Sequence, residues 1–204
     1  MRPLYRFSVA STRGLARLLW GLRLEGVENI PPTGAVLLTS NHVSQLDPPL
    51  VGSFVPREVG FAAKRELFGV PGLGRLIRAL NAIPVDRSNL TRGTLRAFAR
   101  WLGQEKVLIY FPEGTRSRDG RLRRPKVGVG MLLEHCPVTV VPARICGTDA
   151  LLKNLFRRGR VRVVFGRPYT LPQEDGPGEE ERREQYRRTA DAVMDRIREL
   201  APES

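Results

Sequence analysis

The segment from Asn41 to Asp47 (NHVSQLD) places a histidine and a carboxylate directly after a short apolar run. Loops at the carboxyl ends of parallel strands are where open α/β sheets carry their functional groups. Pro48 disfavours helical angles at Asp47, so we expect a loop that folds back on itself. The Asp47 carboxylate could then hold one nitrogen of His42, leaving the other to take a proton from a hydroxyl group. The alternative is that Asp47 caps the next helix and His42 is an ordinary polar loop residue.

The segment from Phe111 to Gly120 (FPEGTRSRDG) also follows an apolar run. Gly114 lets a ligand approach the backbone closely, and Thr115 offers a hydroxyl group. Arg116 carries a forked donor that suits a phosphate, and Glu113 could orient that donor. The alternative is a surface turn with a solvated arginine.

Two further basic residues, Lys64 and Arg87, each follow a short apolar run. Because parallel strands end at the same edge of a sheet, both side chains could meet there. Taken alone, either residue would be a surface base.

Several common signatures are absent from the sequence. The patterns GxSxG, GxxxxGK[ST] and GxGxxG do not occur, which argues against a serine hydrolase, a P-loop enzyme and a dinucleotide-binding protein. The two cysteines and two histidines form no familiar metal-binding spacing, so we expect no metal site. This cysteine usage also predicts a reducing, cytosolic setting.

The elements that must position these residues alternate between strands and helices. Apolar runs predict strands at 35–39, 59–63, 82–85, 106–111, 138–141 and 161–165. Helical patterns lie at 65–80, 89–104, 126–136, 149–156 and 180–200, and a further helix starts at residue 47. This alternation predicts an α/β fold with a mostly parallel sheet flanked by helices.

Residues 1–24 are predicted to form one amphipathic helix, separate from a single domain over residues 25–204. On a helical wheel its apolar side carries Leu4, Phe7, Leu15, Leu18, Leu19 and Leu22. Its opposite side carries Arg2, Arg6, Arg13 and Arg17. Such a helix fits either packing on the domain or lying in a membrane interface.

The composition favours an anionic partner. The 204 residues include 34 Lys+Arg and 21 Asp+Glu, a formal net charge of +13. No uncharged apolar stretch is long enough to span a membrane. Aromatic residues make up only 7% and the basic residues are spread over several segments, so a nucleic-acid partner is not expected.

Taken together, these motifs resemble those of the glycerolipid acyltransferases, and more narrowly the bacterial 1-acylglycerol-3-phosphate acyltransferases. The motifs that carry the resemblance are Asn41-His42-x4-Asp47, Lys64-x-Glu66, Ile83-Pro84-Val85-Asp86-Arg87, Phe111-Pro112-Glu113-Gly114-Thr115-Arg116 and Val141-Pro142. They span about residues 20–170 in the family's order. The sequence departs from the family at Asn81, where a glycine is expected, and at Ala143, where a valine is more usual.

The resemblance implies a role for each matching residue. His42 would be the general base and Asp47 would fix its tautomer. The implied phosphate-binding residues are Arg116, Thr115, Gly114, Lys64 and Arg87, with Glu113 and Asn41 in support. Val141 and Pro142 would belong to the acyl pocket.

The resemblance also implies the reaction and its partners. Acyl-CoA or an acylated carrier protein would donate a fatty acyl chain to the 2-hydroxyl of lysophosphatidic acid, giving phosphatidic acid without a cofactor. The enzyme would be a peripheral, monotopic protein on the cytoplasmic face of the cell membrane, attached to anionic lipid through residues 1–24.

Two alternatives remain open from the sequence. The same chemistry would serve acylation of glycerol-3-phosphate or another lysolipid. A different class of protein, a non-catalytic binder of anionic lipid, would share the basic charge.

Overall fold

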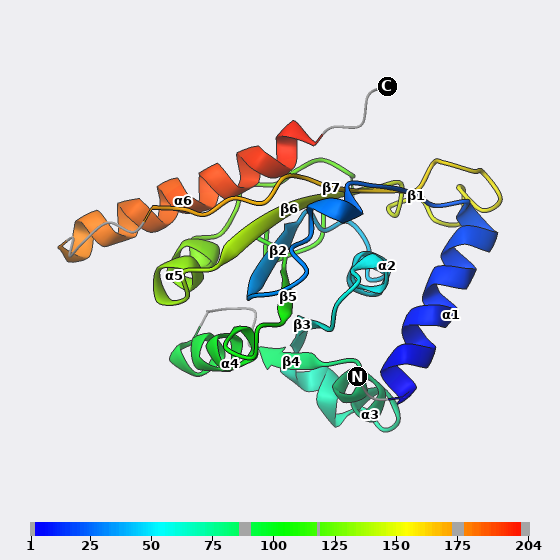
Figure 1. The fold of residues 1–204 in the computed structure, drawn as a ribbon, viewed down its shortest axis with the longest axis horizontal. Coiled ribbons are helices and arrows are strands. Elements are labelled where there is room, and N and C mark those ends of the chain that lie inside the picture. The colour runs from blue at the N-terminus through cyan, green and yellow to red at the C-terminus, as the bar shows by residue number, and fades with distance from the viewer. Residues whose placement is uncertain (1–2, 86–90, 118, 173–177, 201–204) are drawn as a thin grey trace.

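The computed structural model describes residues 3–85, 91–117, 119–172 and 178–200, which are arranged around one seven-stranded sheet (Figure 1). The strands are β1 (Arg23–Glu25), β2 (Val36–Ser40), β3 (Val59–Lys64), β4 (Ala82–Val85), β5 (Val107–Tyr110), β6 (Thr139–Cys146) and β7 (Arg162–Phe165). The α-helices are α1 (Pro3–Trp20), α2 (Asp47–Phe54), α3 (Leu73–Ala79), α4 (Arg92–Leu102), α5 (Gly128–His135) and α6 (Glu179–Glu199). Two short 3₁₀ helices are η1 (Val27–Asn29) and η2 (Arg65–Gly69).

The strand order is β1-β7-β6-β2-β5-β3-β4. The five strands from β6 to β4 are parallel, whereas β7 pairs antiparallel with β6 and β1 pairs parallel with β7. The predicted mostly parallel α/β sheet is therefore confirmed. Because β2, β3, β5 and β6 run in one direction, the segments that follow them all emerge at the same edge.

Alternate residues of the central strands feed two separate cores. In β2, Val36 and Leu38 lie in the core under α1 and α2, and Leu37 lies in the core under α4, α5 and α6. All three are fully buried, because helices cover both faces of the sheet. This two-sided burial explains why the strands appear in the sequence as continuous apolar runs.

Asn81, where a glycine was expected, lies just before β4 with a φ of 64°. Asparagine tolerates this left-handed conformation better than most residues. Its side-chain amide also donates to Glu58 Oε1 at 3.1 Å, so the exchange preserves the turn that enters β4.

The helix predicted at 149–156 is wrong, because these residues form a series of turns. Long-range contacts override the local helical pattern. The backbone N–H of Phe156 donates to Leu19 O at 2.6 Å, and Phe156 adopts a φ of 59°. The side chain of Asn154 donates to Gly147 O at 2.8 Å.

The N-terminal segment also differs from its prediction. The helix α1 ends at Trp20, and Arg23–Glu25 forms strand β1 instead of continuing the helix. The arginine side of α1 does not face solvent throughout. The Arg13 guanidinium donates to the carbonyl groups of Ser53 and Val55, so α1 packs on α2 as part of the same body.

Helices α5 and α6 cross closely at Gly130. A Cβ at Gly130 would lie 2.4 Å from Tyr186 O and 2.6 Å from Tyr186 Cα, both in the backbone of α6. The glycine is therefore needed for helix packing.

We predict that Gly130→Ala lowers the free energy of unfolding by about 1–3 kcal/mol, because α6 must move away from the added methyl group. Gly93→Ala in α4 is the control, since the nearest atom to its Cβ is Thr91 Oγ1 at 3.7 Å. That change should be neutral or stabilising by up to about 1 kcal/mol. Chemical denaturation measures both, and equal stabilities would contradict the close crossing.

Candidate active site

His42 and Asp47 meet at the edge of the sheet where β2, β3, β5 and β6 end. His42 Nδ1 lies 2.9 Å from Asp47 Oδ2, and both side chains are buried. The same carboxylate oxygen accepts the backbone N–H groups of Val43 and Ser44, each at 2.7 Å. The loop thus folds back on its own carboxylate, as expected. The reason inferred from Pro48 is wrong, however, because Asp47 itself begins helix α2.

Asp47 does not cap helix α2. The N-cap position is Leu46, Asp47 is the first helical residue, and no side chain caps this helix end. The alternative that Asp47 caps helix α2 is therefore wrong.

The second oxygen of Asp47 has a partner from a distant part of the chain. The Thr148 hydroxyl donates to Asp47 Oδ1 at 2.6 Å, and Thr148 is buried. No local pattern in the sequence marks Thr148, because it lies 101 positions from its partner. The available signal was its position two residues after β6, at the edge where the other functional segments emerge.

The hydrogen bond to Asp47 fixes the state of the His42 ring. Because Nδ1–H donates to the carboxylate, the neutral imidazole carries its free lone pair on Nε2. The Phe111 ring stacks on the imidazole with a centroid distance of 4.2 Å and an angle of 25°. His42 is thus oriented by one hydrogen bond and one stacked ring.

Two further residues hold the backbone around His42. The Asn41 side-chain amide donates to Ile145 O at 2.9 Å and accepts from Ile145 N at 2.8 Å. These two hydrogen bonds join the chain just after β2 to strand β6, beyond the last residue pair of the two strands. In addition, Ser117 N donates to His42 O at 2.7 Å and links the loop after β5 to the loop after β2.

Glu113 is buried beside this loop. Its carboxylate accepts the backbone N–H of His42 at 3.2 Å and that of Arg123 at 3.3 Å. Burial raises the pKa of Glu113, and these two hydrogen bonds oppose that effect. The sequence predicts that Glu113 orients Arg116, whereas its hydrogen bonds among the described residues go to backbone N–H groups.

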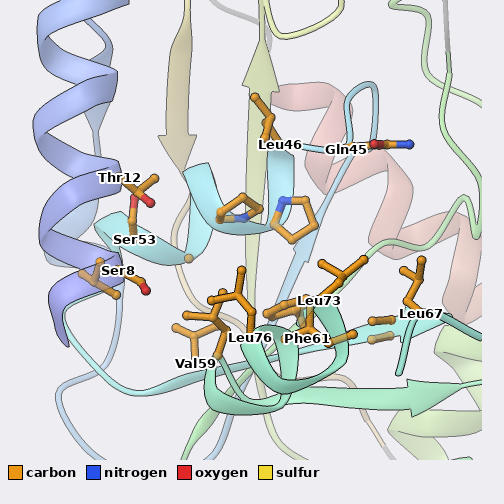
Figure 2. Close-up of a pocket in the computed structure, with 18 of the residues that line it drawn as sticks. Ser8, Thr12, Gln45, Leu46, Ser53, Val59, Phe61, Leu67, Leu73 and Leu76 are labelled. Carbon is orange, nitrogen blue, oxygen red and sulfur yellow. The ribbon is translucent and has the colours of Figure 1, made fainter. Parts of the chain in front are cut away.

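A cavity of about 660 Å³ has His42 in its lining. Figure 2 shows this cavity with other residues that line it. One wall comes from α1, where Ser8 and Thr12 point inward, and another comes from Leu73 and Leu76 of α3. The remaining lining comes mainly from α2 and β3, and most of it is apolar.

Two of the predicted phosphate-binding residues line this cavity together with His42. They are Lys64, at the end of β3, and Arg116, in the loop after β5. Gly114 forms the turn before Arg116 with a φ of 66°, whereas Thr115 is exposed. Arg87 lies outside the described residues.

Val141 and Pro142 do not line the cavity. Both belong to β6, where they pair with Leu38 and Thr39 of the central strand β2. Val141 is fully buried in the core under α1 and α2. The assignment of both residues to an acyl pocket stays a prediction, whereas the cavity beside His42 is built mainly by α1, α2, α3 and β3.

Within the described ranges, no group of three or more histidine, cysteine, aspartate or glutamate side chains could hold a metal ion. Among the helices of the same residues, none has the length and apolar character needed to cross a bilayer.

Comparison with known proteins gives a consistent result. A 1-acyl-sn-glycerol-3-phosphate acyltransferase of Bacillus subtilis is 27% identical over 81% of this chain and 82% of its own length. A chloroplastic enzyme of the same name (LPAT1) from Arabidopsis thaliana is 29% identical over 72% of this chain, which spans only 43% of that protein. The crystal structure of the 1-acyl-sn-glycerophosphate acyltransferase PlsC from Thermotoga maritima aligns with a TM-score of 0.66 and 28% identity. That alignment covers 98% of this chain and 79% of the other.

The family model described as Acyltransferase matches residues 21–146, which is more than half of the chain and includes His42, Asp47 and Arg116. The match begins in the turn after α1 and ends with β6, so it contains the five adjacent parallel strands β6, β2, β5, β3 and β4. The chain therefore belongs to the acyltransferase family.

Proposed function

We propose that this acyltransferase moves a fatty acyl chain from acyl-CoA or an acylated carrier protein to the 2-hydroxyl of lysophosphatidic acid, producing phosphatidic acid. One observation carries the proposal: a histidine held by a buried aspartate opens into an apolar cavity that also contains Arg116 and Lys64. The hydroxyl group of the acceptor requires a base, its phosphate requires cations, and the acyl chains require an apolar cavity.

The reaction needs one base and good positioning. His42 Nε2 takes the proton of the acceptor hydroxyl as its oxygen attacks the thioester carbonyl. The Asp47 carboxylate stabilises the imidazolium that forms. The tetrahedral intermediate then collapses, the carbon–sulfur bond breaks, and the imidazolium returns the proton to the departing thiolate. The products are the new ester and the free thiol, and no cofactor takes part in this step.

The phosphate of the acceptor is assigned to Arg116 and to Lys64, which lines the same cavity. Arginine presents a planar fork of N–H donors, and lysine adds a point charge. Gly114 shapes the loop that carries Arg116, and Thr115 and Arg87 are retained as candidates for the same anion. Placing the phosphate at these cations brings the rest of the acceptor toward His42.

The proposed site of action is the surface of a membrane, at its cytoplasmic face. The product carries two acyl chains, so release into water would be unfavourable. The helix α1 supports peripheral attachment, because the side chains of Leu4, Phe7, Leu15 and Leu18 are exposed.

An assay of the purified protein with both donors and several acceptors tests the proposal. We expect transfer to lysophosphatidic acid. Transfer only to glycerol-3-phosphate or to another lysolipid would replace the acceptor. No transfer to any acceptor, combined with retained lipid binding, would leave a non-catalytic binder of anionic lipid.

We predict that His42→Ala lowers kcat by about 10²- to 10⁴-fold, because the general base is lost. Asp47→Asn should also lower kcat, since a neutral amide does not stabilise the imidazolium. His135→Ala provides the matched control, because this second histidine is exposed at the end of α5. A near-normal rate for folded His42→Ala would refute the mechanism.

We predict that Arg116→Ala raises the KM for lysophosphatidic acid far more than the KM for the acyl donor. Arg116→Lys should restore only part of the loss, because it replaces a fork by a point charge. Arg124→Ala is the control, since it removes the same charge from an exposed position of the same loop. Equal effects on both KM values would assign Arg116 to the donor or to the fold.

We predict that Thr148→Val lowers kcat by about tenfold, since a hydrogen bond to a charged group contributes on the order of 1.5–3 kcal/mol. Thr148→Ser keeps the hydroxyl group and should restore kcat. A normal kcat in a stable Thr148→Val protein would make the contact merely structural.

A further inference from the structure

The turns between β6 and β7 expose large apolar side chains. We name residues 151–160 the basic-apolar loop. The side chain of Leu152 is 89% exposed and that of Phe156 is 70% exposed. Side chains of this kind are usually buried, and two such residues on one short loop indicate a surface that another phase or molecule covers.

The basic-apolar loop is fixed to the C-terminal end of α1, as Figure 1 shows. The backbone N–H of Phe156 donates to Leu19 O at 2.6 Å, and Trp20 Nε1 donates to Leu151 O at 2.9 Å. These contacts hold Phe156 at a φ of 59°, a conformation that a bulky residue rarely adopts. The exposure of its ring is therefore imposed by a defined backbone.

The exposed side of α1 is apolar and joins this loop. Leu4, Phe7, Leu15 and Leu18 are 47%, 70%, 53% and 71% exposed. At 100° per residue these four side chains fall within an arc of about 80° on the helix. The stripe ends at Leu18, one residue before the carbonyl group that binds the loop.

The basic-apolar loop also carries positive charge. Its exposed basic residues are Lys153, Arg157, Arg158 and Arg160. Between residues 147 and 162 the only acidic residue is Asp149. Apolar side chains flanked by cations match the boundary between the acyl chains and the head groups of an anionic bilayer.

From this combination we infer that the basic-apolar loop is a second membrane-docking element, which inserts Leu152 and Phe156 into an anionic bilayer beside the stripe of α1. This inference rests on the proposed function, because it places the enzyme on the membrane that holds its acceptor. A second point of attachment restrains the orientation of the protein on the surface more than one helix alone does.

The docking surface adjoins the candidate active site. The turns that contain the loop begin beside Thr148, whose hydroxyl group binds Asp47. Leu152 follows only four residues later, and α1 lines the cavity with its inner side. Docking through both elements therefore keeps the cavity next to the bilayer that supplies the lipid.

The experiment measures cosedimentation of the full chain with vesicles of phosphatidylglycerol and phosphatidylcholine. Leu152→Ser combined with Phe156→Asn should weaken binding by about tenfold or more, because two inserted apolar side chains are lost. Asparagine is chosen because it tolerates the left-handed backbone at this position. Activity on detergent-dispersed lysophosphatidic acid should stay within about twofold of wild type, since neither residue touches the site.

A second variant tests the charges and leaves Phe156, which has the left-handed backbone, unchanged. Lys153→Gln combined with Arg157→Gln should weaken binding on the order of tenfold at low ionic strength and much less in high salt. Val127→Ser is the control for exposed apolar area, because Val127 is 41% exposed beside α5. Arg183→Gln combined with Arg187→Gln on α6 is the control for charge. Both controls should bind vesicles as the wild type does.

Three results would overturn the inference. Both loop variants, shown to be folded by thermal melting, could bind vesicles as strongly as the wild type. The loop variants could abolish a dimer seen by light scattering without changing vesicle binding, which would make a second copy the occupant. They could raise only the KM for an acylated carrier protein, which would assign the loop to the donor. Vesicle binding is measured without turnover, so a failure of the proposed reaction would remain distinguishable.

Discussion

A buried carboxylate is costly unless hydrogen bonds replace its hydration, and Asp47 meets this requirement with four donors. Three of them lie in its own loop, and the fourth, Thr148, comes from beyond β6. An unpaired carboxylate at this depth would destabilise the fold by several kcal/mol. The loop that bears His42 must therefore fold back, and β6 must deliver Thr148. His42 is oriented because its Nδ1–H is one of the donors that the buried Asp47 carboxylate needs.

The strands supply the restraints that this arrangement needs. The Asn41 side chain extends the pairing of β2 with β6, so the chain leaves β2 in a fixed direction. On the other side, Glu113 accepts the backbone N–H of His42 and joins the loop after β2 to the loop after β5. Three neighbouring parallel strands thus hold one imidazole. This explains why the site lies where the central strands end and not on an isolated loop.

Local information in the sequence was sufficient for six of the seven strands and for the meeting of His42 with Asp47, because apolar runs and a short loop act over a few residues. It missed β1, where Arg23–Glu25 has no apolar run. It was insufficient wherever contacts join distant residues. Thr148 is paired with a residue 101 positions away, and no local pattern marks it. The turns at 149–156 have a helical composition, but their bond to Leu19 prevents a helix. Arginine side chains are usually exposed to solvent, yet the Arg13 side chain donates to carbonyl groups at the end of α2.

Helix α1 lies between the candidate active site and the proposed membrane surface. Its inner side contributes Ser8 and Thr12 to the wall of the cavity, and its outer side exposes a stripe of large apolar residues. Arg13 holds the helix on α2 by hydrogen bonds to the backbone carbonyl groups of Ser53 and Val55. A helix that both lines a cavity and presents an apolar surface keeps the distance between the two short and constant. In the proposed reaction, the acceptor would have to move only across the thickness of this helix to pass from the bilayer to His42.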